Sequence, residues 1–168
     1  MEKRSAVYAG TFDPLTNGHL WMIEQGAALF DSLVIAIGSN PEKRSMFSVE
    51  DRIAMIKEST PRLTNIVIDV FTNKLLIAYA RSIGANFILR GIRTESDYEY
   101  ERVMRNINGD LSPAITTIFL MPPRGIAEVS SSMVKGLMGP EGWEAIIKNY
   151  VPEPVFRKLK EAYNARSR

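Results

Sequence analysis

Short apolar runs alternate with segments of helical periodicity along the chain, and this alternation limits its fold more than any other feature. The runs are nearly continuous in Val, Ile, Leu, Phe and Ala, as expected of strands that are covered on both faces. We predict strands at 6–9, 33–37, 66–70, 87–89 and 117–120. This order predicts an α/β fold with a doubly wound, five-stranded parallel sheet. In such sheets, ligands bind beyond the carboxyl ends of the strands.

The segments between the runs carry helix signals. From Gly18, apolar residues recur at three- and four-residue steps, which predicts a helix with one buried stripe. Ser48 and Ser130 are each placed as the N-cap of a further helix. Helices are also expected at 75–82, around Tyr100 to Ile107, and from Pro154, since proline suits the first turn of a helix.

Composition indicates one domain, 1–168, in which 153–168 forms a C-terminal helix and a frayed basic end. The 21 Lys and Arg residues exceed the 19 acidic residues only slightly, which argues against nucleic-acid binding through bulk charge. Cysteine is absent, so disulfides and thiolate metal sites are excluded. No apolar run approaches the ~20 residues of a membrane helix, and the start lacks a secretion signal. We therefore expect a cytoplasmic protein with no nucleic-acid or membrane partner.

Polar and basic residues follow the predicted strands. The first strand is followed by 10–13 and then by His19, the single histidine, and the second by Lys43. Arg90 to Arg93 follow the fourth strand, and Ser130–Ser132 lie at a predicted helix start after the fifth. Because parallel strands end at one edge of a sheet, and helix N-termini suit anions, these residues predict a pocket for a polyanion. Phosphate is the natural candidate.

Each of these residues also has an ordinary structural interpretation. A single histidine is often a cap, and Lys43 lies in a charged Glu-Lys-Arg stretch. Arg90 and Arg93 could pair with Asp97 or Glu99, and Ser130 could serve only as a cap. Their expected convergence on one edge favours the functional interpretation.

Two common phosphate-binding signatures are absent, because the sequence has no P-loop and no G-x-G-x-x-G after the first strand. Gly10 and the Asn17-Gly18 pair are interpreted instead as a flexible turn in which backbone approaches a ligand closely.

Several motifs together resemble one family. GTFDP and TNGH resemble the [HT]-x-G-H region of nucleotidyltransferases, and the chain from 4 to 160 is similar to bacterial phosphopantetheine adenylyltransferases. The T-x-G-H motif alone indicates only the superfamily, whereas its combination with RGIR and DYEYE is specific. The matching positions are Gly10–Pro14, Thr16–His19, Lys43, Arg90–Arg93, Asp97–Glu101 and Ser130–Ser132. Among the departures from the family, 125–129 lacks the aromatic residues common there and contains Glu128.

The resemblance implies a Rossmann-like nucleotidyltransferase fold and transfer of the adenylyl group of ATP to 4′-phosphopantetheine. The products would be dephospho-coenzyme A and pyrophosphate. It also implies Mg²⁺ bound with ATP and assembly as a homohexamer. The transfer would be a direct in-line displacement without a covalent intermediate, since an ionised acceptor phosphate needs no general base.

The resemblance also implies residue roles. The expected catalytic residues are His19, Lys43 and Arg93. The residues expected to bind phosphopantetheine are Thr11, Lys43, Leu76 and Arg90. The residues expected to bind ATP are Thr11, Phe12, His19, Gly91, Ile92, Arg93, Glu101, Ile126, Ala127, Glu128, Val129, Ser130, Ser131 and Ser132.

Three alternatives stay open. Another T/H-x-G-H enzyme, such as nicotinamide mononucleotide adenylyltransferase, shares the histidine motif but is disfavoured by 90–93 and 97–101. A non-catalytic nucleotide-binding sensor could use the same fold, although His19, Lys43 and Arg93 are all present. A tRNA-synthetase-like fragment is disfavoured by the modest charge and the lack of an appended RNA-binding region.

Overall fold

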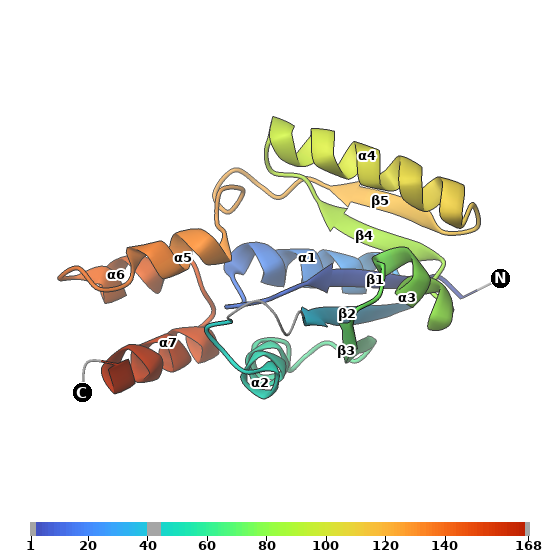
Figure 1. Cartoon of the computed structure of the whole chain (residues 1–168). Helices are drawn as coiled ribbons and strands as arrows, with labels where there is room; N and C mark the ends of the chain where they lie inside the picture. Colours follow the sequence, from blue (N-terminus) through green and yellow to red (C-terminus); the bar gives the residue numbers. More distant parts are fainter. Residues whose placement is uncertain (1–2, 40–44, 167–168) are drawn as a thin grey trace.

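The computed structural model describes residues 3–39 and 45–166. Lys43, a predicted catalytic and substrate-binding residue, lies outside the described residues. The elements in chain order are β1 (Ser5–Gly10), α1 (Asn17–Leu29), β2 (Ser32–Ser39), α2 (Val49–Ser59), β3 (Ile66–Thr72), α3 (Leu76–Ser82), β4 (Phe87–Gly91), α4 (Glu95–Leu111), β5 (Thr116–Leu120), α5 (Ser131–Leu137), α6 (Trp143–Ile147) and α7 (Glu153–Arg166). Figure 1 shows their arrangement.

The strands form one parallel sheet in the order β3-β2-β1-β4-β5, which confirms the doubly wound α/β prediction. Side chains of β1 alternate between its two faces, as a strand requires. Ala6 and Tyr8 join an apolar cluster with residues of α1, α2, α5, α6 and α7. Val7 and Ala9 join a second cluster with residues of α3. Helices therefore cover both faces of the sheet.

The strand order places a crevice at the ends of β1 and β4. The chain adds β2 and β3 on one side of β1, and α3 then carries it back to β4 on the other side. The connections leave β1 and β4 toward opposite sides, so the carboxyl ends of these two strands flank a topological switch point. Gly10 and Gly91 are the last residues of the two strands.

Side-chain caps begin the helices at predicted positions. The Ser48 hydroxyl accepts a hydrogen bond from the backbone N–H of Asp51, and the Ser130 hydroxyl accepts one from Met133. The Asn17-Gly18 prediction is wrong, because the pair forms the first turn of α1 rather than a flexible turn. A Cβ at Gly18 would touch the carbonyl oxygen of Val129 at 3.4 Å, so the close approach there is to the protein's own backbone.

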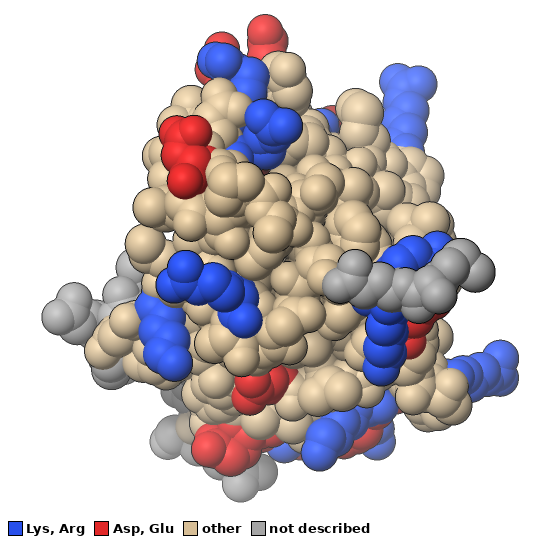
Figure 2. Space-filling model, turned by 90° about the vertical axis from the view of Figure 1, so that its right-hand side faces the viewer, with Lys and Arg blue, Asp and Glu red and all other residues tan. Residues whose placement is uncertain are grey.

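Some elements differ from the sequence prediction. The strands extend beyond the predicted apolar cores, and the short helix α6 was not predicted. Helix α7 continues to Arg166, so most of the predicted frayed end is helical. Among the described residues, no helix combines the length and apolar character needed to cross a membrane. Figure 2 shows the side on which the strands begin, where basic and acidic side chains are scattered around a broad uncharged area.

Candidate active site

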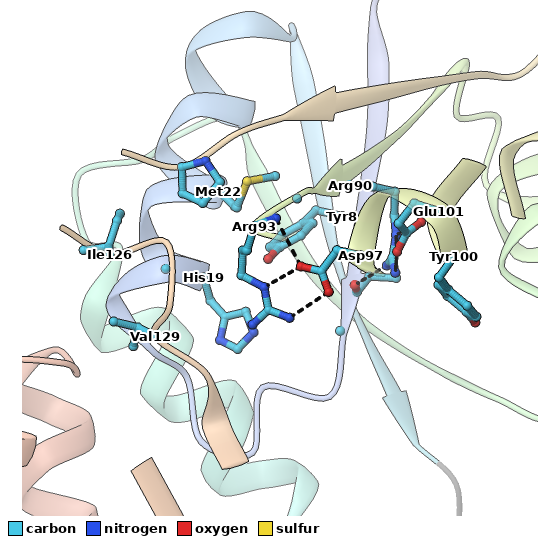
Figure 3. Close-up of a pocket in the computed structure, with 15 residues that line it drawn as sticks. Tyr8, His19, Met22, Arg90, Arg93, Asp97, Tyr100, Glu101, Ile126 and Val129 are labelled. Carbon is cyan, nitrogen blue, oxygen red and sulfur yellow. Dashed lines mark hydrogen bonds and ion pairs between the residues drawn. The ribbon is translucent and has the colours of Figure 1, made fainter. Parts of the chain in front are cut away.

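A cavity of about 360 Å³ opens where β1 and β4 end (Figure 3). Its walls come from β1, the start of α1, the end of β4, the first part of α4 and the segment before α5. The lining residues are Tyr8, Ala9, Gly10, Gly18, His19, Met22, Arg90, Gly91, Arg93, Asp97, Tyr100, Glu101, Pro122, Ile126 and Val129. The structure thus brings the predicted histidine and both predicted arginines to one cavity.

His19 is fixed at the start of α1 by a capping box with Thr16. The Thr16 hydroxyl accepts a hydrogen bond from the His19 backbone N–H, and the Thr16 backbone N–H donates to Nδ1 of His19 at 3.1 Å. A ring nitrogen that accepts a hydrogen bond carries no proton, so the neutral imidazole holds its proton on Nε2. The cap therefore leaves His19 with one free donor.

The His19 imidazole is neutral at physiological pH. Burial lowers its pKa from the ordinary value of 6.5 to about 4, and the nearby positive charge of Arg93 acts in the same direction. The ring also packs edge-to-face against Phe12, with 5.1 Å between centroids. His19 can thus donate a hydrogen bond to a phosphate oxygen, but it does not contribute a positive charge.

Arg90 is held against the carboxylate of Glu101, which projects from α4. Its Nε lies 2.9 Å from both carboxylate oxygens, Nη2 also pairs with Glu101, and Nη1 donates to the carbonyl of Ala9 at 3.2 Å. Both side chains line the cavity, but that of Arg90 is 27% exposed and that of Glu101 only 8%, so Arg90 is the more accessible of the two. A guanidinium has more N–H groups than these contacts use, so donors remain for a phosphate.

Arg93 pairs with Asp97 one helical turn further on. Its Nε lies 2.9 Å from Oδ2 of Asp97, and its backbone N–H donates to the same oxygen at 3.1 Å. Burial raises the pKa of Asp97, but hydrogen bonds from Arg93 outweigh it and leave the pKa below its ordinary value. The ion pair is partly exposed and holds Arg93 at the mouth of the cavity (Figure 3).

A second, more apolar cavity of about 310 Å³ adjoins the first. It contains Thr11, Leu76 and Arg90, the three described residues predicted to bind phosphopantetheine. The residues that line both cavities are Ala9, Gly10, Arg90, Tyr100 and Glu101. The two hollows therefore share a wall, and Arg90 is a charged donor in that wall.

Other predicted ATP-binding residues lie behind or beside the cavities. Phe12 is fully buried, has a left-handed backbone (φ 49°) and lines neither cavity. Ser130 caps α5, and the Ser131 hydroxyl donates to the carbonyl of Pro14 at 2.8 Å. The predicted residues that line neither cavity are Phe12, Ile92, Ala127, Glu128, Ser130, Ser131 and Ser132.

Sequence reasoning missed several lining residues. Tyr8, Met22 and Tyr100 were not predicted to line the site, because each already fitted the apolar pattern of a predicted strand or helix. Asp97 was noted as part of the DYEYE motif and as a possible ion-pair partner, but not as a residue of the binding site. The signal available for Tyr8 was its position two residues before the end of β1, which is where open parallel sheets bind ligands.

This sheet order, with a T-x-G-H histidine and two arginines at one crevice, defines a nucleotidyltransferase. A model of the cytidylyltransferase-like family matches residues 7–137. The fold is similar to Plasmodium falciparum nicotinic acid mononucleotide adenylyltransferase complexed with NaAD, with a TM-score of 0.66, 17% identity and 97% of each chain covered. A putative nicotinate-nucleotide adenylyltransferase from Vibrio parahaemolyticus gives a TM-score of 0.62 at 18% identity, over 96% of this chain and 95% of that one.

Sequence relatives narrow this class. A phosphopantetheine adenylyltransferase of Chromobacterium violaceum is 59% identical over 96% of this chain and 98% of its own. One of Neisseria meningitidis serogroup C is 59% identical over 93% and 92%, and one of Caldanaerobacter subterraneus is 41% identical over 95% and 98%. The chain belongs to the phosphopantetheine adenylyltransferase family, and it is an adenylyltransferase that uses ATP.

Proposed function

We propose that a phosphate oxygen of 4′-phosphopantetheine attacks the α-phosphorus of ATP in this site. One P–O bond forms to the acceptor phosphate while the bond from the α-phosphorus to the β-phosphate oxygen breaks, so pyrophosphate leaves and dephospho-coenzyme A remains. The observation that carries this proposal is the pair of cavities that share Arg90 in their common wall. Two phosphorylated substrates in these cavities would meet head to head.

His19 is assigned the donor role at the α-phosphate. The capping box leaves Nε2–H as the only donor on the imidazole ring. Because the ring is neutral, His19 supplies a hydrogen bond to the phosphate, and Arg93 supplies the positive charge. In-line displacement builds negative charge on the phosphoryl oxygens, and a fixed donor aimed at that charge lowers the barrier. No general base is needed, because the second ionisation of a phosphate monoester lies at a pKa of about 6.

Arg90 and Arg93 are assigned by their positions at the cavities, and Lys43, which lies outside the described residues, is assigned by the family resemblance. Arg93 and Lys43 would offset charge around the ATP phosphates, and Lys43 would also reach the acceptor phosphate. Arg90, held by Glu101, would bind the acceptor phosphate from the shared wall. Glu101 is therefore proposed to act through Arg90, since its carboxylate is engaged by that guanidinium.

The second cavity suits the pantetheine arm. Apolar side chains of α3 and α4 form much of its lining, which also includes Thr11 and Arg90. A ligand with a phosphate at one end and an extended, mostly apolar arm fits this distribution. Leu76 would lie along that arm, and the adenosine of ATP would occupy the first cavity near Ile126 and Val129.

Mg²⁺ is proposed to enter with ATP. Both carboxylates of the first cavity, Asp97 and Glu101, are already engaged by arginines, and the described residues contain no cluster of three acidic or histidine ligands. The residues thus suit a cation held mainly by phosphate oxygens and water, as Mg²⁺ commonly is in nucleotide sites. When bound, the cation would neutralise part of the triphosphate charge.

Assembly as a homohexamer and a cytoplasmic location are also proposed. One face of α4 exposes Tyr100, Val103, Ile107 and Leu111 at helical spacing, with exposed fractions of 62, 49, 45 and 52%. A continuous apolar stripe on a helix supports self-association. The number of subunits follows from the family resemblance, and sedimentation equilibrium would test it.

The experiment that tests the proposed reaction compares acceptors. Pyrophosphate release from ATP should be fast with 4′-phosphopantetheine and at background level with nicotinamide mononucleotide. The reverse preference would assign the chain to a different adenylyltransfer, and no release with either acceptor would favour a nucleotide-binding sensor.

A further inference from the structure

Arg52 is a buried cation that the proposed reaction does not use. It lies on α2 and is 3% exposed. Its Nε donates to the carbonyl oxygen of Ser48 at 3.2 Å and its Nη1 to that of Thr11 at 3.0 Å. Among the described residues, no carboxylate forms an ion pair with it. Buried charges are normally paired with an opposite charge, and carbonyl dipoles compensate a full charge only in part.

The contact with Thr11 places this charge directly behind the substrate site. Thr11 is the first residue after β1 and lines the second cavity. It also lines an adjoining hollow of about 490 Å³, whose walls include Ser39, Asn73 and Lys74. Only Thr11 therefore separates the Arg52 guanidinium from these hollows, and Arg52 fixes the Thr11 peptide group through its carbonyl oxygen.

The same stretch of chain anchors the rest of the loop after β1. The carboxylate of Asp13 accepts hydrogen bonds from the backbone N–H groups of Met46 and Phe47, each at 2.9 Å. Lys135 lies 3.3 Å from that carboxylate, so the Asp13 charge has its own partner. Asp13 thus has a charged partner, whereas Arg52 has no carboxylate partner among residues 3–39 and 45–166.

We propose that Arg52 is a positioning residue for the acceptor phosphate, because it fixes the Thr11 peptide and leaves a buried positive charge that the substrate anion neutralises. This inference rests on the proposed function, in which a phosphorylated acceptor binds beside Thr11. In a poorly solvated site, a fixed charge acts more strongly on an incoming anion than it would in water. Arg52 should therefore discriminate between acceptors with and without a phosphate.

The test compares 4′-phosphopantetheine with pantetheine, which lacks the phosphate. Calorimetric Kd values are measured for the wild type, Arg52→Met and Arg52→Lys. In Arg52→Met, phosphopantetheine should bind about tenfold more weakly, the scale of one interaction with a charged group, while pantetheine binding stays unchanged. Arg52→Lys retains the charge and should keep the preference for the phosphorylated ligand within about threefold. The KM for phosphopantetheine should follow these Kd values, and the KM for ATP should not move.

Unfolding of the ligand-free variants separates this role from a structural one. Arg52→Met removes the cost of burying the charge but leaves the carbonyl oxygens of Ser48 and Thr11 without this donor, so its Tm should lie within roughly 2–4 °C of the wild-type value. If Arg52→Met does not fold, Arg52→Gln is the second neutral variant, and it should lose the same preference. Arg157→Met is the matched control, since Arg157 also contacts α2, through Glu58, but lies on the exposed surface. It should change neither Kd.

Equal weakening of both ligands, or an unchanged preference in the neutral variants, would overturn this inference while leaving the proposed reaction in place. A wild type that binds phosphopantetheine no better than pantetheine would instead contradict the proposed function.

Discussion

The capping box gives His19 two separable tasks, and substitutions can separate them. Its Nδ1 accepts the Thr16 backbone N–H, and its Nε2–H is proposed to donate to the α-phosphate. His19→Ala removes both. His19→Glu restores the acceptor, because glutamate is the usual partner in a capping box, but it replaces the donor with a negative charge. His19→Gln retains an acceptor and a donor on one amide.

The magnitudes follow from these two tasks. Loss of a capping acceptor typically costs about 0.5–2 kcal/mol, and for a protein of this size 1 kcal/mol lowers Tm by roughly 2–4 °C. Loss of a fixed donor to the transition state lowers kcat by about 10²–10³. We therefore expect His19→Ala to be less stable than His19→Glu and His19→Gln. The expected order of kcat is wild type, then His19→Gln, His19→Ala and His19→Glu.

Two assays check this series: pyrophosphate release at saturating substrates gives kcat, and thermal unfolding gives Tm. A kcat of His19→Ala within about fivefold of the wild-type value would contradict the donor role, for which a loss of about 10²–10³ is expected. Equal Tm values for His19→Ala and His19→Glu would contradict the capping role.

Three further predictions follow from the same geometry. Arg90→Ala should raise the Kd for phosphopantetheine more than that for ATP, whereas equal losses by calorimetry would undo the assignment of Arg90 to the acceptor phosphate. The pKa of His19 is about 4 in the folded state and 6.5 in the unfolded chain, so the unfolded chain is protonated first as pH falls. The free energy of unfolding therefore decreases as pH falls from about 6.5 to about 4. Between pH 7 and 4, the wild type should lose roughly 3 kcal/mol more unfolding free energy than His19→Gln, and an imidazole NMR titration near pH 6.5 would contradict this. Asp13→Asn should cost about 1–3 kcal/mol in urea unfolding, because one buried N–H of 46–47 then faces an amide donor, and a loss below about 0.5 kcal/mol would show that the contacts are dispensable.

Much of the fold was predictable because local signals agreed with it. Continuous apolar runs marked all the strands of the described sheet, and Ser48 and Ser130 were recognisable as caps from their position before a helical pattern. Strand ends were less predictable, since hydrogen bonding continues past the last apolar residue. The five-residue helix α6 carries too few turns to produce a periodic pattern.

The candidate site was predictable only in part. The convergence of His19, Arg90 and Arg93 followed from the rule that parallel strands end at one edge. The pairing of Arg93 with Asp97 was among the ion pairs considered from the sequence. The pairing of Arg90 with Glu101 depends on how α4 packs against β4, which the sequence does not reveal.

The capping role of the histidine and the buried position of Arg52 were not predicted, because neither residue matches a recognisable sequence pattern. A histidine at N3 departs from the glutamate or glutamine of the usual capping signature, so the pattern was not recognisable. Arg52 lies in a segment that looks like an ordinary charged helix, and only the three-dimensional structure shows its contact with Thr11.

The most direct measurement of the central claim is a crystal structure with dephospho-coenzyme A, the product that joins both substrates. We expect its diphosphate at the wall shared by the two cavities, within hydrogen-bonding distance of Nε2 of His19 and the Arg90 guanidinium. Its adenosine should fill the first cavity, and its pantetheine arm should pass Leu76 in the second. A product bound with its diphosphate away from this wall, or with both ends in a single cavity, would contradict the account.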